Sequence, residues 1–176
     1  VIELAGLTTQ LRQVHFLAQL AHESAGFTTT EEFASGAAYE GRRDLGNLKR
    51  GDGRKFIGRG LIQLTGRANY ARIGNILGVD FIANPNLAGQ FPWAALTAAI
   101  FWRENRINEA ADKDDVRRVT RIINGGYNGL ADRQKYLAAT RRALDPVRAA
   151  QRRLASLNYA LGSIDGRIVP LTRSAI

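Results

Sequence analysis

Apolar residues recur at helical spacing over most of this chain. The first helix is predicted from five residues on one face: Leu11, Val14, Leu17, Ala18 and Ala21. It should end near His22-Glu23, before Gly26. Helical spacing returns from about Arg67 to Leu77, where Gly78 closes the helix.

Four further segments carry an apolar stripe at this spacing: about 92–105, 115–124, 131–144 and 147–157. Pro92 stands where the first helical residue is expected, and Asp114-Asp115 place negative charge at the start of the next helix. Gly125-Gly126 end that helix, and the following one stops before Pro146. The pattern therefore predicts a mainly α fold.

The segment from Thr28 to Arg59 lacks a sustained period and is rich in Gly, Asp, Asn and Arg. We expect loops with a short hairpin, and such long irregular segments in compact domains are usually functional or disordered. Pro146 is the predicted boundary between a domain over 1–145 and a helical tail over 146–176. The tail is too short to form a core by itself.

The amino-acid composition indicates a folded domain and excludes several kinds of functional site. Hydrophobic residues make up 45% and charged residues 23%, which is typical of a folded globular domain. The absence of cysteine excludes a disulfide framework, a thiolate metal site and a cysteine nucleophile. No apolar run is long enough to span a membrane, and no signal peptide is predicted within these residues.

The formal net charge of +9 is unevenly distributed, with +2 in residues 1–88 and +7 in residues 89–176. Such a field favours a polyanionic partner, which could be nucleic acid, an anionic membrane or a bacterial wall. Aromatic residues are not interleaved with the arginines of the last third, so we expect no nucleic-acid site.

Two carboxylates flank the start of the irregular segment. Glu23 ends the first apolar helix, and Glu32 follows nine residues later, with Glu31 beside it and Glu40 further on. A carboxyl at the rim of an apolar helix can be desolvated and kept protonated, whereas one in a polar loop stays ionised. This division suits a general acid and a general base, although glutamates in a loop-rich segment also fit a merely solubilising role.

Residues 58–65 place two glycines around an arginine and then alternate apolar and polar side chains. If this is a strand, Gln63 and Thr65 share one face, where an amide and a hydroxyl could hold a sugar or a water. An ordinary short strand is the simpler alternative. His15 and His22 lack the spacing of metal ligands, so we expect structural roles and no metal.

Four separated motifs occur in order: Ala18-Gln19-Leu20-Ala21-His22-Glu23-Ser24-Ala25-Gly26-Phe27 followed by Glu32; Gly58-Arg59-Gly60-Leu61-Ile62-Gln63-Leu64-Thr65 with Asn69-Tyr70; Ile122-Ile123-Asn124-Gly125-Gly126; and Asp132-Arg133. Together they resemble glycoside hydrolase family 19, which contains chitinases and the lysozyme-like endolysins of bacteriophages. The resemblance covers roughly residues 10–145 and implies a lysozyme-like helical domain. The tract 34–47 looks like the endolysin and bacterial branch.

The resemblance implies roles for the two carboxylates. Glu23 matches the proton donor, and Glu32 matches the base that activates water in an inverting reaction. Inverting sites separate their carboxyls by roughly 6.5–9.5 Å to leave room for that water, so we predict this separation here. Glu40, in the same loop, is the reserve candidate for the base.

The remaining site residues also follow from the resemblance. Thr65 matches the hydroxyl that positions the water, and neither a metal nor a cofactor is implied. The substrate-binding positions fall on five residues: Gln63, Asn69, Tyr70, Asn124 and Arg133. Of these, Arg133 matches a position near the second carboxylate. The chain departs from the family at Ala25, where Gly is usual.

The tail resembles the first part of a type 1 peptidoglycan-binding domain. Its matching residues are Val147–Leu154, Leu157-Asn158-Tyr159, Leu161-Gly162, Ile164-Asp165-Gly166 and Thr172–Ile176. The usual Phe-Gly after Asp-Gly is replaced by Arg167-Ile168-Val169. A helix that merely packs on the first domain is the alternative.

These features predict a monomeric phage-type endolysin that hydrolyses β-1,4 bonds of peptidoglycan glycan strands. Its basic half would hold it on an anionic bacterial wall or outer membrane surface, and it would stay in the host bacterial cytoplasm until release to the periplasm and wall. A chitinase acting on N-acetylglucosamine polymers and a catalytically idle wall-binding protein are the alternatives.

Overall fold

The computed structural model describes residues 1–159 and residue 164. Helical elements follow one another in the order α1 (Ile2–Ala5), α2 (Gln10–Glu23), η1 (Ala37–Tyr39), η2 (Arg43–Leu45), α3 (Asp52–Lys55), α4 (Arg67–Leu77), η3 (Pro85–Gly89), α5 (Trp93–Glu104), α6 (Asn108–Ala111), α7 (Val116–Asn124), α8 (Leu130–Ala143) and α9 (Pro146–Ser156). Here α marks α-helices and η marks 3-10 helices. This confirms the predicted mainly α fold.

The long helices begin and end where local signals place them. The Thr9 side chain accepts a hydrogen bond from the backbone N–H of Arg12 and caps α2. Asp115 caps α7 in the same way, through the N–H of Arg118. Gly78 and Gly125 follow α4 and α7 in the left-handed conformation, which a residue without a Cβ adopts at no steric cost.

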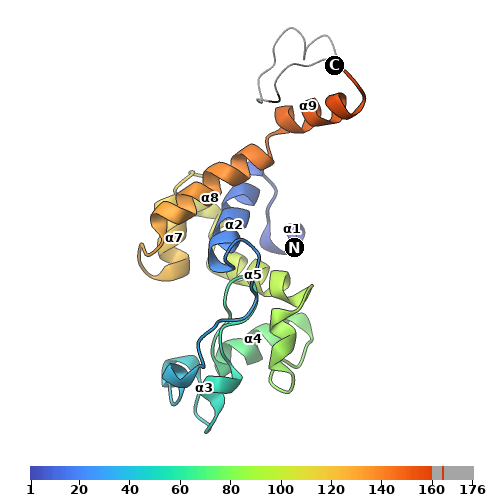
Figure 1. Cartoon of the computed structure of the whole chain (residues 1–176). Helices are drawn as coiled ribbons and strands as arrows, with labels where there is room; N and C mark the ends of the chain where they lie inside the picture. The colour runs from blue at the N-terminus through green and yellow to red at the C-terminus, as the bar shows by residue number, and fades with distance from the viewer. Residues whose placement is uncertain (160–163, 165–176) are drawn as a thin grey trace.

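The helices form two lobes joined by α5 (Figure 1). One lobe holds α2, α7 and α8, and the other holds α3, α4 and the loops around them. In the irregular segment, short helical turns replace part of the expected loop. Among the described residues, extended pairing is limited to isolated bridges of Arg59 with Glu31 and Leu64.

The strand predicted over 58–65 is wrong. The backbones of Arg59 and Leu64 exchange two hydrogen bonds, and residues 60–63 form a tight turn between them. Gln63 has a positive φ of 56° and therefore breaks the strand alternation on which a shared face depends. The sequence contains the apolar-polar alternation of a strand, but the turn at residues 60–63 interrupts that strand.

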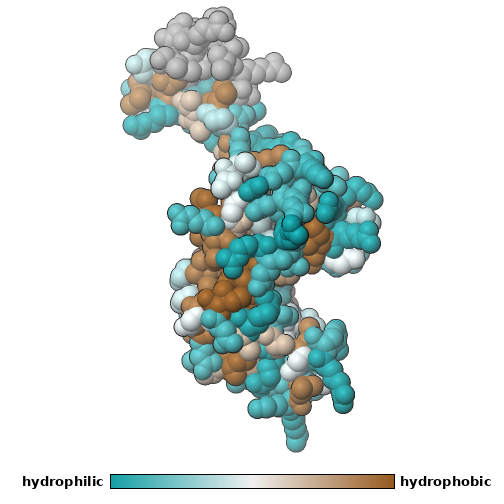
Figure 2. Space-filling view, turned by 180° about the vertical axis from the view of Figure 1, so that it is seen from behind, coloured by the Kyte–Doolittle hydropathy of each residue, from teal (hydrophilic) through white to brown (hydrophobic). Residues whose placement is uncertain are grey.

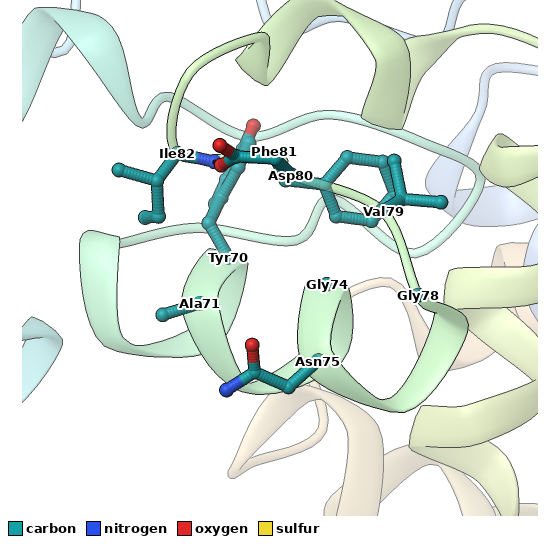
Figure 3. Close-up of a pocket in the computed structure, with 9 residues that line it drawn as sticks. All are labelled: Tyr70, Ala71, Gly74, Asn75, Gly78, Val79, Asp80, Phe81 and Ile82. Carbon is teal, nitrogen blue, oxygen red and sulfur yellow. Dashed lines mark hydrogen bonds between the residues drawn. The ribbon is translucent and has the colours of Figure 1, made fainter.

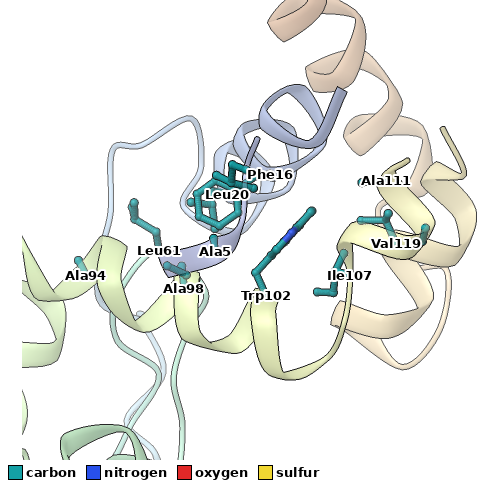
Figure 4. Packing of buried hydrophobic residues seen from close by; sticks show 13 residues of the cluster. Ala5, Phe16, Leu20, Leu61, Ala94, Ala98, Trp102, Ile107, Ala111 and Val119 are labelled. Atoms are coloured by element: carbon teal, nitrogen blue, oxygen red, sulfur yellow. The ribbon is translucent and has the colours of Figure 1, made fainter. Parts of the chain in front are cut away.

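Two apolar clusters fill the lobes, and α5 contributes to both. Trp102 lies in the first cluster, where its ring meets Phe16 edge to face at 5.2 Å between centroids (Figure 4). Ile100, two residues earlier, is buried in the second cluster with Tyr70 and Phe81. Opposite faces of one helix therefore join the two lobes, and Trp102 is a core residue.

The surface is mostly hydrophilic, with hydrophobic residues gathered near the middle of the body in the view of Figure 2. Within the part of the chain that the structure describes, no helix is both long and apolar enough to cross a membrane.

Helix α9 begins at Pro146 and lies at one end of the molecule, beyond α8 (Figure 1). Asp145 caps it by accepting hydrogen bonds from the N–H groups of Val147 and Arg148. The tail residues at 160–163 and 165–176 lie outside the described residues, and the division at residue 146 stays a prediction.

Candidate active site

A cleft of about 700 Å³ lies between the two lobes. Its walls come from five regions of the chain: Glu23 at the end of α2, Tyr39 and Leu45 in the irregular segment, Ile62–Thr65 with Asn69, Arg72 and Ile73, Phe101 of α5 with Asn105 just after that helix, and Ile123-Asn124 at the end of α7. The structure thus brings five predicted site residues together: Glu23, Gln63, Thr65, Asn69 and Asn124.

Glu23 is the last residue of α2, and its side chain is 19% exposed. A carboxylate at a helix C-terminus lies against the negative end of the helix dipole. Arg133 offsets this by donating from Nη2 to Glu23 Oε1 at 2.5 Å. The carboxyl is therefore oriented by a charged donor at a position open to the cleft.

Arg133 is paired with the first carboxylate, Glu23, and among the described residues no hydrogen bond or ion pair joins it to Glu32. Its side chain is 1% exposed, and its other hydrogen bonds go to Gln19 Oε1 and the carbonyl of Asn128. Because protein groups accept hydrogen bonds from this guanidinium, Arg133 orients Glu23 from the protein interior. A basic residue on α8 gave no sequence signal that it would meet the end of α2.

Glu32 adjoins the cleft through Tyr39, whose hydroxyl donates to Glu32 Oε2 at 3.1 Å. The backbone N–H of Gly58 donates to the same oxygen at 3.0 Å. A Cβ on residue 58 would lie 2.5 Å from this oxygen, so only glycine allows the approach. The other oxygen, Oε1, is buried and has no hydrogen-bond partner among the described residues.

Tyr39 was not among the predicted site residues. Burial, followed by its hydrogen bond to Glu32, raises the pKa of the Tyr39 hydroxyl, which therefore remains a donor at neutral pH. Its position seven residues after Glu32 was the available signal. Arg72, Phe101 and Asn105 were missed too, because they lie on helices whose facing partners are distant in sequence.

Glu40 occupies a different place. Its carboxylate accepts from the backbone N–H groups of Gly51 at 2.6 Å and Gly53 at 2.8 Å. Together with Arg50 and Arg54 it lines a separate hollow. Glu40, the reserve candidate for the base, thus holds the backbone just before and within α3.

The turn at residues 60–66 brings polar groups into the cleft. The Thr65 hydroxyl donates to the Gln63 carbonyl at 2.9 Å, and the Asn69 side-chain amide donates to the Thr65 carbonyl at 2.9 Å. Gln63 donates from Nε2 to the Gly60 carbonyl at 3.1 Å. Side-chain oxygens of Gln63 and Asn69 remain to accept hydrogen bonds from a ligand.

The Tyr70 hydroxyl lies in the protein interior, and Tyr70 does not line the cleft. It is fully buried, donates to the Ile57 carbonyl at 2.7 Å and accepts from Arg59 at 3.2 Å. Burial raises the pKa of this hydroxyl to about 12. Figure 3 shows Tyr70 beside Phe81 in a separate pocket of about 340 Å³, whose lining shares no residue with the cleft.

Both histidines pair with aspartates. His15 Nε2 lies 2.8 Å from Asp114 Oδ1, and His22 Nδ1 lies 2.7 Å from Asp132 Oδ2. Among the described residues, no group of three or more His, Cys, Asp and Glu side chains is arranged to hold a metal ion.

Comparisons with known proteins agree with this arrangement. A family model described as chitinase class I, of glycoside hydrolase family 19, matches residues 5–121. A "Glycosyl hydrolase family 19 domain-containing protein" from Haemophilus influenzae is 34% identical over 78% of this chain and 82% of its own length. Chitinase 8 of Oryza sativa subsp. japonica is 31% identical over 63% of this chain. The matched region is only 49% of that rice protein.

Solved structures show the same fold at low identity. Chitinase C from Streptomyces griseus HUT6037 has a TM-score of 0.61 and 23% identity, covering 76% of this chain and 59% of that one. A class IV chitinase from Zea mays has a TM-score of 0.60 and 23% identity, covering 80% and 70% of the two chains. These similarities agree with the predicted helical domain.

Proposed function

We propose that this chain, which belongs to glycoside hydrolase family 19, hydrolyses the β-1,4 glycosidic bonds of bacterial peptidoglycan with inversion. One observation carries the proposal: a cleft between two lobes presents Glu23, held by Arg133, and adjoins Glu32, held by Tyr39. The two carboxyls come from different elements and have different partners, as an acid and a base require.

Glu23 is the proposed general acid. Its proton passes to the glycosidic oxygen as the bond to C1 breaks, so that the leaving sugar departs as a neutral alcohol. Arg133 stabilises the carboxylate that remains, because its Nη2 already lies 2.5 Å from Glu23 Oε1. Arg133 is a positioning residue in this scheme, since its guanidinium is buried.

Glu32 is the proposed general base. A water attacks C1 from the face opposite the leaving group and gives its proton to Glu32. Oε2 accepts hydrogen bonds from Tyr39 and Gly58, and Oε1 is buried without a described partner, so this step requires the water to reach the Glu32 carboxyl when the substrate is bound. The Thr65 hydroxyl is proposed to position the water, and the carboxyl separation of roughly 6.5–9.5 Å stays a prediction.

The sugars are proposed to be held by cleft amides, since the 2-acetamido groups of peptidoglycan offer both donors and acceptors. Gln63, Asn69 and Asn124 supply these amides. The charge of +7 in residues 89–176 favours an anionic wall or outer membrane surface. In this proposal the protein is a monomeric endolysin of the phage type, released from the host cytoplasm to the wall.

A chitinase is the second candidate, because the rice relative and both structural neighbours are named chitinases. The acid and base described above would serve chitin equally well, since chitin contains the same β-1,4 linkage. The two substrates differ in the acidic groups that peptidoglycan carries and chitin lacks.

Product analysis tests the proposal. Purified peptidoglycan and chitin oligomers are digested in parallel, reduced with borohydride and analysed by mass spectrometry. We expect new reduced amino-sugar ends from peptidoglycan, and their identity shows which bond is cut. Products from chitin alone would replace the proposal with the chitinase. No product from either substrate, with folded protein bound to walls, would leave a binding protein.

A further inference from the structure

The exposed face of α7 continues one wall of the cleft. Asn124, the last residue of the helix, lines the cleft. Arg121 and Arg117 precede it by three and seven residues, a spacing that puts all three on one side of an α-helix. Both arginines are exposed, so two guanidinium groups lie on the same side of the helix as Asn124.

These two arginines are free to bind an anion. Within the described part of the chain, neither Arg117 nor Arg121 forms an ion pair with an acidic residue, although many other arginines here do. Asp115, the nearest acidic residue in the sequence, is used to cap the helix through the N–H of Arg118. The stripe therefore presents uncompensated positive charge.

The stripe is also held in place. The Arg117 guanidinium lies over the Tyr127 ring, with Cζ 4.6 Å from the ring centroid, a cation–π contact that restrains the side chain. Val119, on the opposite side of the helix, is buried. An arginine that is already ordered loses less conformational entropy when it binds a carboxylate.

We infer that this stripe of Arg117, Arg121 and Asn124 is an outer part of the substrate site that binds the lactyl and stem-peptide carboxylates of peptidoglycan. The inference rests on the proposed function and deepens it. Chitin is a neutral polymer of one amino sugar, whereas every second sugar of peptidoglycan carries an acidic substituent. Paired guanidinium groups beside the cleft match this acidic strand by charge.

The test compares two substrates and two double variants. Arg117→Gln with Arg121→Gln removes the charge of the stripe. Lys135→Gln with Arg142→Gln, on the exposed surface of α8, removes the same charge from residues that do not line the cleft. The substrates are soluble peptidoglycan strands, native or with their carboxyl groups amidated by carbodiimide and glycinamide. Thermal unfolding checks that each variant is folded.

We expect the α7 variant to lose about fivefold in kcat/KM on native strands, since each exposed ion pair contributes a factor of roughly two to three. The loss should shrink at high salt and vanish on amidated strands, and the α8 variant should match the wild type. An equal loss in both variants, or a loss that survives amidation, would overturn the inference.

Binding separates this inference from the proposed function. Co-sedimentation with intact sacculi measures the stripe without any cleavage, and the α7 variant should bind more weakly than the α8 variant. Equal binding of the two variants overturns the role of the stripe. Wild-type protein that binds sacculi through α7 but releases no new reducing ends contradicts only the hydrolytic function. Stronger competition by free phosphate polymers than by stem peptides would assign the stripe to a phosphate-bearing partner and overturn its role in the substrate site.

Discussion

Glu23 and Glu32 carry the same carboxyl group but accept hydrogen bonds from different kinds of donor. Glu23 meets a permanent cation, Arg133, whereas Glu32 accepts from the neutral donors Tyr39 and Gly58. The first arrangement favours a residue that must end its step as a carboxylate. The second orients a carboxylate through neutral donors and leaves it the negative charge that a base needs.

Replacing Glu23 by Gln should abolish turnover with little effect on the fold. The amide keeps the shape and accepts from Arg133 but has no acidic proton to donate, and general acids typically contribute a factor of about 10²–10⁴. We expect kcat on peptidoglycan to fall at least about a hundredfold, measured by release of reducing ends. Near wild-type kcat in a folded variant would exclude Glu23 as the acid.

Glu32→Gln and Glu40→Gln form a matched pair that separates the two candidate bases. Glu32→Gln should lower kcat at least about a hundredfold, because an amide cannot take the proton of the water. Glu40→Gln should keep activity within about threefold but lower the free energy of unfolding by about 1–2 kcal/mol, because the bonds to Gly51 and Gly53 weaken. Kinetics and urea unfolding measure both, and the reverse pattern would make Glu40 the base.

The elements place functional residues mainly at their ends. Glu23 closes α2 and Asn124 closes α7, and both line the cleft. The periodicity of apolar residues predicted these helices because it depends only on local sequence, and their caps fixed the ends. The turn over 60–66 was harder to predict, since its shape depends on hydrogen bonds between Arg59 and Leu64 and on the backbone of Gln63.

His15 connects α2 to the residues just before α7 and should make stability depend on pH. Burial lowers the pKa of His15 below 6.5, and this outweighs the hydrogen bond to Asp114 and the charge of Asp115, while Arg141 acts with burial. The Nε2–H can donate to Asp114, but a proton on Nδ1 would be buried without a described partner.

The direction in which stability changes with pH follows from proton binding to His15. As the pH falls through 6.5, the unfolded chain takes up a proton that the folded protein still excludes, so stability decreases. We expect the free energy of unfolding in urea to fall between about pH 7 and pH 5, and His15→Gln to reduce this slope. An unchanged slope in the variant would show that other groups cause it.

At the scale of the whole molecule, α5 joins the two lobes whose meeting forms the cleft. Trp102 and Ile100 belong to different apolar clusters, while Phe101 and Asn105 face the cleft. The cleft therefore depends on packing that is shared between both cores. A substitution that disrupts this packing should therefore lower the free energy of unfolding, with no direct effect on the catalytic step.

Trp102→Ala should destabilise the entire molecule by about 3–5 kcal/mol, the usual cost of truncating a buried aromatic residue to alanine. It removes the contact with Phe16 and the hydrogen bond from Nε1 to Asn108 Oδ1 at 2.7 Å. Leu48→Ala is the control, because Leu48 is 72% exposed and should change stability by no more than about 0.5 kcal/mol. Chemical unfolding compares them, and equal small effects would contradict the shared core.

The sequence alone determined the long helices, their order, most of their ends and the carboxylate at the end of α2, but not the short helical turns between them. These features depend on apolar periodicity and on capping residues that are close together in the chain. Motif order also pointed to the family, and five of the assigned residues meet in the cleft.

Only the tertiary structure decided what surrounds each of these residues. Arg133 reaches Glu23 across 110 positions of sequence, Tyr39 holds Glu32, and Tyr70 turns into the core. Such contacts depend on how distant elements pack, which local periodicity does not encode. Helices are set by neighbours in sequence, whereas the environment of a carboxyl is set by neighbours in space.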